Sequence, residues 1–138
     1  MKLVIIDGQG GRLGSLLTEE IKRANLPCEI TAIGTNSIAT AAMLKAGADY
    51  AATGENPVVV TCRDADVIVG PIGIIAADSL LGEVTPAMAV AVGQADAVRI
   101  LIPLNRCDNL VAGVADLSMG ALIEDAMRKF DSLAGGTK

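Results

Sequence analysis

The chain has no histidine and no tryptophan, and Tyr50 and Phe130 are its only aromatic residues. Without histidine it lacks the commonest general base at neutral pH and the commonest metal ligand, and a Ser/His/Asp triad is excluded. With only two aromatic side chains, the protein is not expected to stack nucleic-acid bases or to form an aromatic cage for a cation. The usual side chains of an enzyme site are therefore scarce.

Cysteine is rare as well. Cys28, Cys62 and Cys107 are an odd number of thiols, and their spacing matches neither a zinc site nor a redox pair. We therefore expect no metal. Cys107 is the thiol best placed for chemistry, but an inert small residue explains it more simply.

Basic clusters and long apolar segments are also missing. The net charge is −5, which disfavours nucleic acid and anionic membranes as partners. The longest uncharged apolar run, 67–77, is too short to span a bilayer and contains Pro71. The first residues, MKLVIID, enter a strand pattern without a signal peptide, so a cytoplasmic location is expected.

What the chain does have is aliphatic residues in alternating strand and helix patterns. Hydrophobic residues make up 51% of its 138 positions, enough for one domain, which we place at 1–132 with a flexible tail at 133–138. Strands are predicted at 3–7, 29–33, 48–54, 66–70, 98–103 and 110–114, and helices at 12–24, 38–46, 72–82, 85–95 and 118–130. Segment 57–65 leaves two alternatives open: Asn56 and Pro57 favour the start of a helix, whereas its three consecutive valines favour a strand.

This alternation predicts an α/β fold. We expect a doubly wound, mainly parallel sheet with helices on both faces, a Rossmann-like three-layer α/β/α arrangement. The predicted helices at 72–82 and 86–95 carry few charges around their circumference. Such helices are often buried against another copy, so a homo-oligomer is expected.

Glycines concentrate between the first strand and the first helix, in LVIIDGQGGRLGSLL. Gly8, Gly11 and Gly14 form a G-x-x-G-x-x-G pattern, which permits a tight turn and close approach of a pyrophosphate to a helix start. The predicted cofactor-binding loop comprises Gly8, Gln9, Gly10, Gly11, Arg12, Leu13 and Gly14. The alternative is a glycine-rich turn used only for tight packing.

The loop GQGGRLG resembles that of dihydrodipicolinate reductases and related NAD(P)-binding domains. An acidic residue that selects NAD usually ends the second strand. Here that place reads Gly34, Thr35, Asn36 and Ser37, and Arg12 is the nearest cation, so NADP is slightly favoured over NAD. Equally, Asn36 or Ser37 could simply cap the next helix.

Further candidates follow other strands, because ligands of open α/β sheets bind at the carboxyl ends of the strands. They are Gly70, Pro71, Ile72 and Gly73, whose backbone amides could meet a ligand or form a plain turn, and Asn105, which could bind an anion or lie in a surface loop. Asp7 could orient a sugar, but a cap of the glycine loop is preferred.

Six blocks of sequence, in order, carry a wider resemblance: IDGQGG, GTNSIATAAMLKAGAD, ATGEN, GPIGI, LGEVTPAMA and LIPLNRC. They resemble a family of small bacterial proteins catalogued as domain of unknown function 3842. The resemblance implies a compact Rossmann-like domain without an assigned activity or catalytic residues.

Three functions stay open at this point. The first is a nucleotide-binding module, NAD(P) being the expected ligand. The second is a small oxidoreductase or transferase with a site at an oligomer interface, drawing on Asp7, Asn36, Asn105 or Cys107. The third is a structural protein with no ligand. Because no substrate domain is evident, the first is preferred, and whether the chain is an enzyme is left open.

Overall fold

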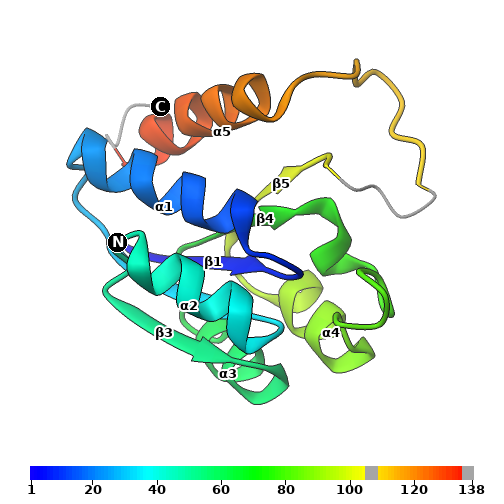
Figure 1. Ribbon diagram of the computed structural model, residues 1–138. Coiled ribbons are helices and arrows are strands. Elements are labelled where there is room, and N and C mark those ends of the chain that lie inside the picture. The colour runs from blue at the N-terminus through cyan, green and yellow to red at the C-terminus, as the bar shows by residue number, and fades with distance from the viewer. Residues whose placement is uncertain (105–108, 135–138) are drawn as a thin grey trace.

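The computed structural model describes residues 1–104 and 109–134. Its centre is a five-stranded parallel sheet with the strand order β3-β2-β1-β4-β5, covered by helices on both faces (Figure 1). The strands are β1 (Lys2–Asp7), β2 (Glu29–Gly34), β3 (Tyr50–Thr53), β4 (Val67–Pro71) and β5 (Val98–Ile102). The helices are α1 (Arg12–Ala24), α2 (Ser37–Lys45), α3 (Glu55–Cys62), the 3-10 helix η1 (Ile72–Ile75), α4 (Pro86–Gln94) and α5 (Met119–Ala134). The predicted fold class is confirmed.

Two aliphatic cores lie on opposite faces of the sheet. Alternate residues of β1 divide between them: Leu3 and Ile5 pack with α1, α2 and α5, whereas Val4 and Ile6 pack with α3, η1 and α4. Continuous apolar strands such as 3–6 are therefore buried on both sides, as parallel strands covered by helices require.

The topology places a crevice between β1 and β4. The chain runs from β1 through β2 to β3 on one side and returns to β4 on the other side of β1. Ligands of open α/β sheets bind at such a switch point, outside the carboxyl ends of the strands. Here those ends are Asp7 and Pro71.

Two predicted elements are wrong. Only 72–75 of the predicted helix 72–82 is helical, because Asp78, Leu80 and Leu81 have positive φ values of 66°, 56° and 57°. The chain turns there and sends Leu80 into the core. Segment 110–114 is not a strand, since it pairs with none of the strands and turns at Gly113, whose φ is 80°.

The structure also defines segment 57–65 and the ends of the last helix. Segment 57–65 falls largely in helix α3 rather than in a strand. Helix α5 is capped by Ser118, whose Oγ accepts from the Ala121 N–H at 3.2 Å, and it continues past Phe130 to Ala134. The division into a domain at 1–132 and a tail at 133–138 stays a prediction, and 135–138 lie outside the described residues.

Candidate functional site

The glycine loop joins β1 to α1 by a tight left-handed turn. Gln9 and Gly11 have φ values of 50° and 74°, and the Gly11 N–H donates to the Gly8 carbonyl oxygen at 2.9 Å. Gly11 is the residue before α1 and offers no side chain as a cap. The first amides of the helix therefore depend on other acceptors.

Packing explains three of the four glycines. A Cβ on Gly8 would lie 2.5 Å from Thr35 Oγ1, one on Gly11 would lie 2.7 Å from the Ala39 Cα, and one on Gly14 would lie 2.4 Å from the Met43 sulfur. A Cβ on Gly10 would meet no atom within 4 Å. Tight packing is thus a real purpose of this corner, but it does not account for Gly10.

Asp7 caps the loop, as preferred from the sequence. Its side chain is 5% exposed, and its two carboxylate oxygens accept from the N–H groups of Gly8 at 2.8 Å and Gly14 at 2.7 Å. Burial raises the pKa of Asp7, the two amides oppose that rise, and the charge of Glu83 adds to it. Asp7 lines the small pocket at this corner, and both of its carboxylate oxygens are engaged by loop amides.

Three amides of the loop are left without acceptors. Within 1–104 and 109–134, no group accepts from the N–H of Gly10, Arg12 or Leu13, and the Arg12 guanidinium forms no ion pair. These residues line a pocket of about 90 Å³ at the switch point, which Pro71, Leu80, Leu104 and Met119 close on the other side. Free amides at a helix start, next to a cation, favour an anion.

Glu83 was not predicted, yet it lies at this corner. Its Oε1 atom accepts from the Gln9 N–H at 2.8 Å, from Thr35 Oγ1 at 2.7 Å and from Asn36 Nδ2 at 2.8 Å. Burial opposes ionisation of this carboxyl group, but the three donors outweigh it and lower the pKa of Glu83. A carboxylate thus stands at the end of β2 after all, supplied by the loop before α4.

The polar residues after β2 have structural roles as well. Asn36 caps α2, because its side chain accepts from the Ala39 N–H at 2.9 Å, and Ser37 is the first residue of that helix. The capping alternative for Asn36 is therefore confirmed. Its Nδ2 atom also donates to the Gln9 carbonyl oxygen at 2.9 Å, so Asn36 ties the glycine loop to α2.

The candidates after β4 are only partly brought to the loop. Pro71 lines the small pocket, whereas Ile72 and Gly73 lie in η1, and the Gly73 carbonyl oxygen accepts from the buried Ser79 hydroxyl. Gly70 lies within β4 and makes room for Ile6. Asn105, with Cys107, lies outside the described residues.

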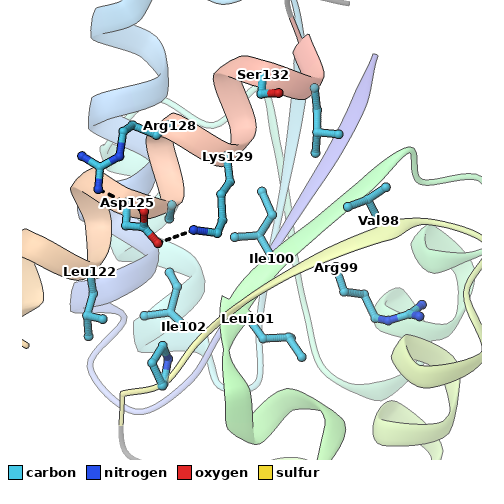
Figure 2. Close-up of a pocket in the computed structure, with 13 residues that line it drawn as sticks. Val98, Arg99, Ile100, Leu101, Ile102, Leu122, Asp125, Arg128, Lys129 and Ser132 are labelled. Atoms are coloured by element: carbon cyan, nitrogen blue, oxygen red, sulfur yellow. Dashed lines mark hydrogen bonds and ion pairs between the residues drawn. The ribbon is translucent and has the colours of Figure 1, made fainter. Parts of the chain in front are cut away.

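A larger cavity of about 820 Å³ lies between β5 and α5, along the edge of the sheet (Figure 2). Ile100 and Ile102 point toward α5 in it, and Asp125 pairs with Arg128 and Lys129 on its rim. Both cations are thus engaged by one carboxylate, and the cavity shares no lining residue with the pocket at the glycine loop. We do not place the candidate site there.

The described ranges lack two features, a metal-binding cluster and a membrane-spanning helix. No group of three or more Cys, Asp or Glu side chains in 1–104 and 109–134 is arranged to hold a metal ion. In the same ranges no helix has the length and apolar character needed to cross a bilayer.

Comparison with known proteins identifies the family. The sequence profile named Domain of unknown function (DUF3842) matches residues 2–134. The chain belongs to this family. No curated protein matches this member of DUF3842.

Among solved structures, a dodecameric FMN-dependent UbiX-like decarboxylase from Escherichia coli O157:H7 is similar to this DUF3842 chain. The similarity covers 94% of each chain, at 14% identity and a TM-score of 0.44. A likeness of that size says nothing about the ligand of this chain.

Proposed function

We propose that this chain is a cytoplasmic nucleotide-binding module that holds a phosphate of its ligand, NAD(P) in the first place, on the glycine loop. The observation that carries the proposal is the set of three unpaired amides, those of Gly10, Arg12 and Leu13, lining one pocket. Gly10 and Arg12 are exposed and Leu13 is buried. The first N–H groups of a helix have no partner within it, so these three can donate to an anion that enters the pocket.

The size of the pocket limits what binds inside it. About 90 Å³ is the volume of roughly three water molecules, which suits a phosphoryl group and not a whole nucleotide. The sugar and base would extend from the pocket over the ends of β1 and β2. Leu104 and Met119, which close the pocket, would have to shift for a second nucleotide half to lie beyond Pro71.

The competing enzyme hypothesis has less support. Asp7, one of its proposed participants, spends both carboxylate oxygens on the N–H groups of Gly8 and Gly14. Asn36 serves as a helix cap. A binding or regulatory module needs neither residue for chemistry, so it fits the observed contacts better.

Replacing Gly10 by valine tests the phosphate site. A Cβ at position 10 meets no protein atom within 4 Å and the φ of Gly10 is not positive, so the variant should fold normally. Its methyl groups would occupy the space that a phosphate needs, and we expect the affinity for NAD⁺ and NADP⁺ to fall at least about 100-fold. Titration calorimetry and thermal shift with both nucleotides measure this, since a ligand specific to the folded state raises the melting temperature.

Gly93→Val, at an exposed position of helix α4, is the matched control and should bind like the wild type. Gly11→Val is a poor test, because the φ of 74° and the contact with Ala39 would damage the fold itself. If millimolar nucleotide stabilises neither the wild type nor the control, the reading of this corner as a purely structural turn is correct.

We also propose that the chain forms a homo-oligomer. Support comes from large apolar side chains left in solvent: Leu81 is 95% exposed, Leu110 96% and Val90 52%. Such side chains mark an interface where they gather into one apolar patch. Sedimentation equilibrium should give a mass above the monomer's, and Leu81→Asn with Leu110→Asn should lower it. Asparagine tolerates the left-handed backbone at position 81, so the fold should survive. A monomeric wild type would contradict the proposal.

A further inference from the structure

We propose that Glu83 is the carboxylate that binds the ribose hydroxyls of the nucleotide and rejects a 2′-phosphate, so that the site selects NAD over NADP. This inference rests on the proposed function. It reverses the preference for NADP that the sequence after β2 indicates, because that preference assumed no acid at this place.

The position of Glu83 is the first argument. In dinucleotide-binding sheets the acid that contacts the ribose follows the second strand. Glu83 Oε1 is hydrogen-bonded to Thr35 and Asn36, the two residues that directly follow β2. It also accepts from the Gln9 N–H, and the next amide along the loop, that of Gly10, is one of the three unpaired ones. The carboxylate and the phosphate pocket are thus neighbours.

The glycine loop is shaped around this carboxylate. A Cβ on Gly8 would lie 2.9 Å from Glu83 Oε1 as well as 2.5 Å from Thr35 Oγ1. The first glycine of the motif therefore leaves room for Thr35, Glu83 and Leu80 together. The sequence pattern and the position of Glu83 belong to one arrangement.

Packing holds Glu83 in place. On either side of it along the chain, Leu80 and Val84 are only 4% and 1% exposed, and the Asp78 N–H donates to the Val84 carbonyl oxygen at 2.7 Å. Three positive-φ residues, Asp78, Leu80 and Leu81, persist in this loop because these buried contacts determine its path. The carboxylate is therefore a fixed part of the site, and an incoming ligand must accommodate it.

The second oxygen of Glu83 is available. In the part of the chain that the structure describes, Oε2 accepts no hydrogen bond, whereas Oε1 accepts three. A ribose hydroxyl can donate to a free carboxylate oxygen in a charge-assisted bond. A 2′-phosphate would instead place a doubly charged group beside it, and like charges in contact are strongly disfavoured.

The experiment compares the affinities of NAD⁺ and NADP⁺ by titration calorimetry for the wild type, Glu83→Gln and Glu55→Gln. Glutamine at position 83 keeps an oxygen for Gln9, Thr35 and Asn36 but removes the charge. Glu55, whose carboxylate accepts from Thr85 Oγ1 at 2.6 Å, provides the same change of net charge near the same sheet edge. We expect the wild type and Glu55→Gln to prefer NAD⁺ about tenfold or more, and Glu83→Gln to bind both about equally.

The outcomes separate the two proposals. If neither nucleotide binds the wild type, the nucleotide site itself is refuted, and the role of Glu83 falls with it. If both bind but the wild type prefers NADP⁺ or shows no preference, the nucleotide site stands and the role of Glu83 is wrong. A preference for NAD⁺ that Glu55→Gln abolishes as fully as Glu83→Gln also overturns it, because general charge then explains the effect. A wild type that does not prefer NAD⁺ refutes the role of Glu83 even if a variant fails to fold.

Discussion

Gly70→Ala should destabilise the chain by about 3 kcal/mol or more, a large part of the total stability of a domain of this size. Gly70 lies in β4, where a Cβ would come within 2.3 Å of the Ile6 carbonyl oxygen on β1 and 3.0 Å of the Ile74 Cδ1. The first of these neighbours is backbone of the central strand, which cannot move aside without disturbing its own pairing. The adjoining strands must separate or the chain must unfold.

Gly10→Ala is the matched control, because its Cβ meets no atom within 4 Å. It should change the free energy of unfolding by no more than about 1 kcal/mol, because alanine there acts chiefly by restricting the unfolded chain. Urea titration followed by far-ultraviolet circular dichroism suits both variants, since the chain has no tryptophan to report unfolding. Equal stability of the two variants would show that β1 and β4 tolerate a wider separation than the contacts indicate.

The fold was predictable from the sequence because each core strand has a local sequence pattern that indicates it. Residues 3–7, 29–33 and 66–70 are short apolar runs, and the helices between them show caps such as Asn36 and Thr85. The errors arise where an apolar pattern is buried without regular structure. In 72–82, Ile74 and Leu80 enter the core from successive turns, and periodicity alone does not distinguish this from a helix.

The candidate site was predictable only where it is local. The glycine pattern identified the loop, and the acid directly before it, Asp7, was correctly read as a cap. Glu83 could not be found in this way, because 48 positions separate it from Thr35, its hydrogen-bonding partner. Only the return of the chain from β4 across the sheet brings the two together. An isolated glutamate in a turn carries no sign of that contact.

The corner thus combines two carboxylates with a site proposed for an anion. Asp7 and Glu83 each neutralise part of the positive end of α1 and its loop, and the charge of Glu83 raises the cost of ionising Asp7. A phosphate bound there would therefore be held by the amides of Gly10, Arg12 and Leu13 together with the Arg12 side chain. Asp7 itself fixes the path of the loop through its bonds to Gly8 and Gly14, and its buried charge opposes folding.

Asp7→Ala should lower the free energy of unfolding by about 2–4 kcal/mol, because it leaves the buried amides of Gly8 and Gly14 without acceptors. Asp7→Asn should cost less, since its amide oxygen still accepts from one of the two. Urea titrations at pH 7 of the three proteins should therefore place Asp7→Ala below both the wild type and Asp7→Asn. An alanine variant as stable as the wild type would mean that water replaces both bonds.

The pH dependence isolates the charge of Asp7. Because burial raises the pKa of Asp7 in the folded state above its ordinary value of 3.8, the folded chain binds this proton more tightly than the unfolded chain does. The stabilisation from the protonated group is complete below 3.8 and is lost as the pH rises through the raised folded pKa. The stability of the wild type relative to Asp7→Asn should accordingly fall over that interval and then level off. Most other carboxyl groups act equally in both proteins, so the difference between two urea titration series reports Asp7. A difference that instead grows with pH would show that the two loop amides outweigh burial.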